Sequence, residues 1–160
     1  GIAVLAGAGC ATNQPLKEAR AAYGAWQYME ASKKAKEALK VDDRSAEALY
    51  IRGMAAVELK DYLMGRELLE KAREFYEPDT EKGMRLMRQL ALAHFFLEDL
   101  EQAEVTFNEY MAIKEQNGRL LLEDDYYWAG AIADVAMKET LRDSYWSKLS
   151  SEFKKAKGIK

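Results

Sequence analysis

The sequence predicts an all-helical fold of stacked helix pairs, an α-solenoid, and two observations indicate it. Only two prolines, Pro15 and Pro78, occur in 160 residues. The stretches between them are rich in Ala, Leu, Glu, Lys, Met and Arg, which lose little conformational freedom on entering a helix. Small and large apolar residues also recur with a period of about 34 residues, which is the spacing of stacked helix pairs. A chain of this length buries a core without disulfides, so we expect one folded domain.

The repeat is clearest in residues 46–83. Small and large residues alternate there at fixed places, and places four, eight, seventeen, twenty, twenty-four and twenty-seven hold Leu49, Gly53, Tyr62, Gly65, Leu69 and Ala72. The small residues at places eight and twenty let the two helices of a pair cross closely. The large ones fill the gaps between neighbouring pairs. This segment therefore predicts one helix pair.

Two further copies flank this segment. In residues 12–45, places eight, eleven, seventeen, twenty and twenty-seven hold Ala19, Ala22, Tyr28, Ala31 and Ala38. In residues 84–117, after a four-residue insertion, places four, eight, seventeen, twenty and twenty-four hold Met87, Ala91, Leu100, Ala103 and Phe107. Pro78 lies at the insertion, and we expect Asp79 or Thr80 to cap the helix that follows. Some places depart from the pattern: Pro15 and Ala35 stand where large residues are expected, and Tyr110 stands where a small one is.

Residues 118–160 are expected to close the open end of the stack, because each pair has an apolar face that it cannot bury alone. The segment LLEDDYYWAGAIADVAMK has apolar and small residues at helical spacing, and TLRDSYWSKLSSEFKKAKG predicts a second helix that ends at Gly158. The small-residue places are poorly kept, so we interpret this region as a degenerate fourth copy or a capping hairpin. About eight helices and no sheet are expected.

On these matched positions, residues 12–117 resemble the tetratricopeptide repeat family. The resemblance implies an α-solenoid of about three helix pairs, covering residues 12–45, 46–83 and 84–117, with a C-terminal capping pair in residues 118–160. It also implies a non-enzymatic function, in which the first helix of each pair lines a concave groove that binds a protein or peptide. Function follows from fold analogy here.

The resemblance implies which side chains point into this groove. The matching places hold Arg20 and Tyr23 in the first copy, Glu47, Tyr50, Met54, Val57 and Glu58 in the second, and Arg85, Arg88, Leu92, Phe95 and Phe96 in the third. Met, aromatic and Arg side chains are typical of peptide-binding surfaces. Arg85 and Arg88 are expected to hold an acidic segment or a carboxylate terminus through forked hydrogen bonds. An alternative is that Val57, Leu92, Phe95 and Phe96 pack against the capping helices.

Residues 1–10, GIAVLAGAGC, resemble the end of a bacterial lipoprotein signal peptide. Ala8 and Gly9 match the small-residue box that precedes a lipid-accepting cysteine, whereas Gly7 departs from the branched aliphatic residue that the family prefers. The resemblance implies lipidation of Cys10, which would anchor the chain to the cell envelope, facing the periplasm. The alternative is a cytoplasmic protein with a structural apolar N-terminal segment and a free thiol.

Charge and motif content disfavour other classes of function. The formal charge is −3, and residues 140–160 carry six Lys or Arg against two acids, so the rest of the chain is acidic. No coherent basic face for nucleic acid is expected. The lone histidine, His94, has no partner at metal-ligand spacing and is expected to be a partly buried helix residue. Phosphate-binding loops, nucleophile elbows and cofactor motifs are missing, so we expect no enzyme, metal or cofactor.

The C-terminal aromatics are the remaining feature. Tyr126, Tyr127 and Trp128 lie on one expected helix, with Tyr145 and Trp146 on the next. Most are expected in the core, but three neighbouring aromatics cannot share one helix face, so some are expected to form a second contact patch or a self-association surface. The leading hypothesis is a lipid-anchored adaptor that assists assembly of a cell-envelope complex. The alternatives are a soluble cytoplasmic scaffold and a small-ligand-binding transporter accessory protein with an aromatic pocket.

Overall fold

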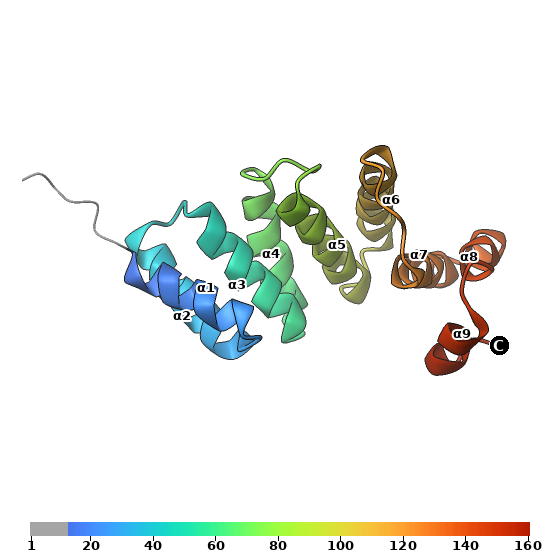
Figure 1. Cartoon of the computed structure of the whole chain (residues 1–160), viewed down its shortest axis with the longest axis horizontal. Coiled ribbons are helices and arrows are strands. Elements are labelled where there is room, and N and C mark those ends of the chain that lie inside the picture. The colour runs from blue at the N-terminus through green and yellow to red at the C-terminus, as the bar shows by residue number, and fades with distance from the viewer. Residues whose placement is uncertain (1–12) are drawn as a thin grey trace, which may run out of the picture.

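The computed structural model describes residues 13–160, which form nine α-helices in an extended stack (Figure 1). The helices are α1 (Gln14–Gly24), α2 (Tyr28–Val41), α3 (Ala46–Glu58), α4 (Tyr62–Arg73), α5 (Glu81–Phe96), α6 (Leu100–Gln116), α7 (Glu123–Val135), α8 (Glu139–Trp146) and α9 (Ser151–Lys157). Cys10 lies outside the described residues. No helix in residues 13–160 combines the length and apolar character needed to cross a membrane.

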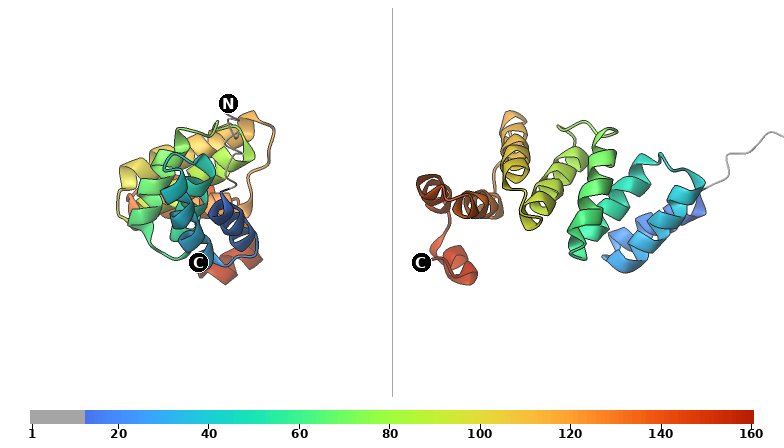
Figure 2. Two further views of the ribbon diagram at one scale, coloured as in Figure 1. Left: turned by 90° about the vertical axis from the view of Figure 1, so that its left-hand side faces the viewer. Right: turned by 180° about the vertical axis from the view of Figure 1, so that it is seen from behind.

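Consecutive helices pack in pairs, and each pair packs on the next. The closest neighbours are α1 with α2, α3 with α4, α5 with α6 and α7 with α8, while α2, α4 and α6 contact the first helix of the following pair. Helix α3 also contacts α1 and α5, so the first helices share one side of the stack. Figure 2 shows the same extended arrangement end-on and from behind. These contacts confirm the predicted α-solenoid.

The same turn joins the two helices of every pair. Trp26, Lys60, Glu98 and Met137 each have a φ between 60° and 63°, in the left-handed region. The residue after each of them donates its N–H to the carbonyl oxygen five residues earlier, at 2.8 or 2.9 Å. This pattern satisfies carbonyl groups at the end of the first helix. Four pairs are therefore built on one turn, and the last of them is α7 with α8.

A small residue lies seven places before each of these turns, at Ala19, Gly53, Ala91 and Gly130. A Cβ at Gly53 would lie 2.7 Å from Cδ2 of Leu69, and a Cβ at Gly130 would overlap the Trp146 indole. Leu69 and Trp146 occupy the same place of their copies, so α7 and α8 cross as α3 and α4 do. Arg142 stands where the second small residue is expected. The fourth copy therefore keeps one crossing residue and has lost the other.

Side-chain caps set several helix starts. The side chains of Asn13, Ser45, Asp61, Thr80, Asp99 and Ser150 each accept a hydrogen bond from the backbone N–H three residues on. Thr80 does so with Gly83 at 3.1 Å, which confirms the predicted cap of α5. The single helix expected over residues 140–158 is instead two helices, because Ser150 caps a new helix while Leu149 is buried at the break.

Two hydrophobic clusters form the core, and α5 contributes to both. The first cluster joins α1 to α5 and includes Leu69, Leu86 and Leu90. The second joins α5 to α7 and includes Met87 and Phe107. Helix α5 is therefore the element that makes the stack continuous, because two different faces of it are buried in different clusters.

Candidate functional site

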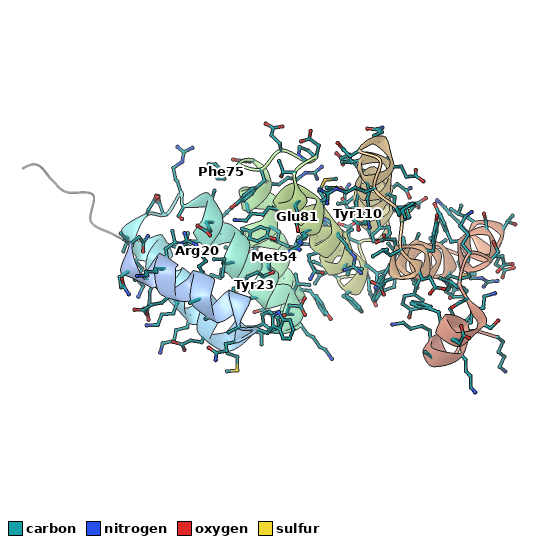
Figure 3. The ribbon with its side chains drawn as sticks, in the orientation of Figure 1. Arg20, Tyr23, Met54, Phe75, Glu81 and Tyr110 are labelled. Atoms are coloured by element: carbon teal, nitrogen blue, oxygen red, sulfur yellow. The ribbon has the colours of Figure 1, made fainter. Side chains whose placement is uncertain are left out.

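The predicted groove runs along the first helices of the pairs, and buried side chains fill its N-terminal part. Figure 3 labels Arg20 and Tyr23 on α1, with Met54 on α3 close by. Tyr50 and Met54 are only 3% and 4% exposed. The Tyr50 ring contacts Tyr23 at 6.4 Å and Tyr76 at 5.4 Å between centroids, and burial raises its pKa. Tyr50 and Met54 are thus core residues, and of these four groove positions only Arg20 and part of Tyr23 are open to a partner.

Polar contacts tie the first helices together along this face. Arg20 donates two hydrogen bonds to Glu47, at 2.8 and 2.6 Å, and Lys82 lies 3.9 Å from the same carboxylate. The Arg20 guanidinium lowers the pKa of the Glu47 carboxyl. Further along, Gln89 donates to Glu58 at 2.8 Å. Such surface contacts contribute roughly 0–1 kcal/mol each, so they set register more than stability.

The two arginines expected to bind an acidic partner have different surroundings. Arg85 is 62% exposed and pairs at 2.6 Å with Glu81, one turn earlier on its own helix. Arg88 is 24% exposed and forms an ion pair with Asp124 on α7, with Asp125 at 3.8 Å. Arg88 therefore joins α5 to α7, and a partner carboxylate at this position has to displace Asp124.

A buried polar junction holds α7 against α6. Asp125 is 2% exposed and accepts hydrogen bonds from the Tyr110 hydroxyl at 2.9 Å, Lys114 Nζ at 2.8 Å and the Leu122 backbone N–H at 2.9 Å. Burial, followed by the Asp125 charge, raises the pKa of Tyr110. Sequence reasoning missed this junction, although Tyr110 at a small-residue place was a signal, because a buried phenol needs a hydrogen-bond partner.

The open part of the groove lies where α3, α4, α5 and α7 meet. We call it the central cleft; it measures about 270 Å³ and is lined by Val57, Glu58, Lys60, Tyr62, Arg88, Gln89, Leu92, Phe96 and Trp128. Phe96 is 43% exposed, stacks on Tyr62 at 4.6 Å and meets Trp128 edge-on at 5.7 Å. The cleft thus brings together predicted groove residues, including Glu58, and one of the C-terminal aromatics.

Phe95 lines a second hollow, which shares no lining residue with the central cleft, and its ring centroid lies 5.9 Å from that of Trp128. This C-terminal cleft measures about 410 Å³ and is lined by Phe95, Tyr127, Ala131, Asp134, Val135, Arg142, Asp143, Trp146 and residues 157–160. The assignment of the groove residues to partner binding stays a prediction. On this face, open space remains toward the C-terminal half of the stack.

His94 is buried in α5, and no group of three or more possible metal-ligating side chains occurs in the part of the chain that the structure describes. Its Nε2 lies 3.7 Å from Glu70 and its Nδ1 lies 3.6 Å from Asp99. Burial lowers the pKa of His94, and this effect outweighs the two carboxylates, which raise it. The His94 imidazole therefore binds a proton more weakly in the folded protein than in the unfolded chain.

This difference predicts a pH dependence of stability. Below the ordinary histidine pKa of about 6.5, the unfolded chain takes up a proton at His94 that the folded protein resists, so the free energy of unfolding is expected to fall between about pH 7 and 5. His94→Gln should remove this part of the slope and leave the acid-induced loss from carboxylates such as Glu47. Urea unfolding across this pH range measures it. An unchanged slope in the variant would contradict the role given to His94.

The helix pairs and their shared turn agree with a family comparison. Residues 44–116 match the family model described as tetratricopeptide repeat. The fold is a tetratricopeptide-type solenoid. The matched segment covers the second and third pairs, and the turn and crossing geometry extend the same solenoid to the first and fourth. No curated protein matches the chain at a significant level of sequence similarity.

Solved structures show the same solenoid. MamA from Desulfovibrio magneticus RS-1, residues 41 to the end, aligns with a TM-score of 0.72 and 17% identity over 91% of this chain and 78% of that one. Another MamA crystal structure aligns with a TM-score of 0.69 and 20% identity, covering 91% of this chain and 81% of that one. PilW, described as a widely conserved type IV pilus biogenesis factor, aligns with a TM-score of 0.56 and 15% identity over 91% of this chain and 82% of its own.

Proposed function

We propose that this tetratricopeptide solenoid is a non-enzymatic adaptor that binds a segment of a partner protein in the central cleft. The observation that carries the proposal is the exposed ring of Phe96 in a concave site where three helix pairs meet. Large aromatic side chains in such sites supply much of the binding energy of protein interfaces. Lys60 and Glu58 add charges of both signs at the cleft, which suits a polypeptide with mixed side chains.

The cleft proposal predicts a selective loss of binding. Phe96→Ser should weaken capture of the partner from a host lysate by about tenfold or more, because an aromatic anchor contributes about 2 kcal/mol or more. Val105→Ser is the matched control, since Val105 is 56% exposed on α6, a second helix of its pair. Quantitative mass spectrometry of affinity-purified samples measures the loss, with circular dichroism to confirm folding. Equal recovery by both variants would remove the central cleft from the proposal.

We further propose that the adaptor is lipid-anchored through Cys10, faces the periplasm and assists assembly of an envelope complex. The support is the small-residue box before Cys10 and the likeness to PilW, a pilus biogenesis factor. Metabolic labelling with a tagged fatty acid tests this directly when the natural reading frame is expressed in bacteria. Label that is present in wild type and absent from Cys10→Ala supports anchoring. If neither protein is labelled, the cytoplasmic scaffold becomes the better hypothesis.

A further inference from the structure

We propose that the C-terminal cleft binds an acidic segment of a protein, with one aromatic or aliphatic side chain as its anchor. The residues that line this site all differ from those that line the central cleft, so the inference goes beyond the proposed function and does not depend on it. Three properties of the cleft carry the inference: its size and apolar wall, the charge at its rim, and the charge of the rest of the chain.

The cleft has room for a side chain and an apolar wall to receive it. Its volume of about 410 Å³ lies in the range of about 300–1,000 Å³ typical of ligand-binding clefts. The Tyr127 and Trp146 rings stack at 6.5 Å with an interplanar angle of 12°, and Trp146 is fixed by a hydrogen bond that its indole donates to the Tyr127 carbonyl at 3.1 Å. Ala131 and Val135 continue this surface along α7. An apolar anchor would therefore meet a pre-formed wall.

Unpaired positive charge gathers at the rim of the same cleft. Lys157 and Lys160 line the cleft, and within the residues that the structure describes neither forms an ion pair. Three further lysines without an ion pair belong to the same C-terminal segment but do not line the cleft: Lys148, Lys154 and Lys155. Lys157 lies over the Tyr127 ring, with Nζ 4.8 Å from its centroid. The two carboxylates lining the cleft, Asp134 and Asp143, are already bound by Arg142 at 2.7 and 2.9 Å. The rim thus presents an excess of cations to any ligand.

The rest of the chain favours a short protein segment over a larger polyanion. The formal charge is −3 and residues 140–160 carry six Lys or Arg against two acids, so the remaining residues carry a net −7. A bilayer or a long nucleic acid presents extended negative charge that the acidic body repels. A short acidic segment meets only the basic rim, and its apolar anchor uses a concave wall that a flat surface does not enter. Charge complementarity of this kind raises the rate of association and sets specificity.

The experiment is a binding titration of the full chain, followed by fluorescence anisotropy. The probe is a fluorescein-labelled peptide of glutamates around one central phenylalanine. We expect saturable binding that weakens as salt is raised. Lys157→Glu with Lys160→Glu should weaken binding by about tenfold or more, because two rim charges are reversed. Val135→Glu, at a position 50% exposed and therefore tolerant, should weaken it by placing a carboxylate on the apolar wall.

Controls separate this site from general electrostatics and from the central cleft. Lys33→Glu with Lys36→Glu makes the same charge change on α2, at the other end of the stack, and should bind the peptide like wild type. Phe96→Ser should also bind the peptide like wild type, because Phe96 lines the central cleft and not the C-terminal cleft. If the proposal for the central cleft is wrong, the peptide titration still tests the C-terminal cleft. If the peptide does not bind the C-terminal cleft, the proposal for the central cleft still stands.

Several results would overturn the inference. A peptide with serine in place of phenylalanine that binds equally well would show that no anchor is used. Equal weakening by the α2 variant would show that overall charge governs binding. Phosphatidylglycerol vesicles or single-stranded DNA, if either binds through Lys157 and Lys160 while the peptide does not, would assign the rim to lipid or nucleic acid.

Discussion

Replacing Asp125 with alanine is expected to lower the free energy of unfolding by about 3 kcal/mol. The carboxylate is 2% exposed, and its removal leaves the Tyr110 hydroxyl and the Lys114 ammonium, 14% exposed, without their acceptor. A buried charge left unpaired costs more than the pair contributes, because the partner stays desolvated. Hydrogen exchange should show the loss first in α7 and α8, which dock through this junction. Urea unfolding followed by circular dichroism gives the magnitude.

The neighbouring carboxylate provides the control for this prediction. Asp124 lies on the same turn of α7, is 45% exposed and pairs with Arg88 alone. Asp124→Ala should therefore lower the free energy of unfolding by less than about 1 kcal/mol. Asp125→Asn, which keeps an acceptor for Tyr110 but loses the charge facing Lys114, should fall between the two. Equal losses for Asp124→Ala and Asp125→Ala would contradict the buried junction.

Gly83→Ala is expected to lower the free energy of unfolding by about 2 to 3 kcal/mol. A Cβ at Gly83 would overlap the carbonyl oxygen of Glu77, which also accepts a hydrogen bond from the Thr80 hydroxyl at 2.7 Å. Backbone atoms cannot rotate away as a side chain does, so the segment between α4 and α5 has to shift. The Thr80 cap of α5 lies in that segment and would be disturbed with it.

Gly24→Ala is the matched control, because nothing lies within 4 Å of a Cβ built at Gly24. Gly24 ends α1, and alanine favours a helix more than glycine does, so this variant should be as stable as wild type or slightly more stable. Thermal unfolding of the two variants compares them directly. If Gly83→Ala and Gly24→Ala had the same melting temperature, the loop before α5 would accommodate the extra methyl group without loss of stability.

The solenoid was predictable because its residues obey a strict local rule. Small residues such as Gly53 and Gly65 are needed wherever two helices cross, and their spacing is visible in the sequence alone. The insertion at Pro78 and the cap at Thr80 followed from the same register. The fourth pair was harder to predict. Gly130 is a small residue at the first crossing place, but the large Arg142 stands at the second, and the turn at Met137 has no distinctive side chain.

The candidate site was less predictable, because burial in the groove depends on contacts between distant segments. Tyr50 occupies a groove place in the repeat, yet Tyr76 from the segment before α5 packs on it. Arg88 was expected to be free for a ligand, but Asp124, which is 36 residues away, pairs with it. Neither contact has a signature at helical spacing. The C-terminal cleft likewise includes residues 157–160, which reach it because the chain breaks between α8 and α9, and this break was not expected.

The central claim is that a partner protein occupies the central cleft, and site-specific photocrosslinking tests it most directly. A benzophenone amino acid replaces either Phe96 in the cleft or Val105 on α6, which is exposed to a similar degree. Each protein is expressed in its host and irradiated, and its crosslinked products are identified. We predict one dominant partner at position 96 and none of it at position 105. Equal crosslinking at both positions, or crosslinks at position 105 alone, would contradict the adaptor function proposed for this cleft.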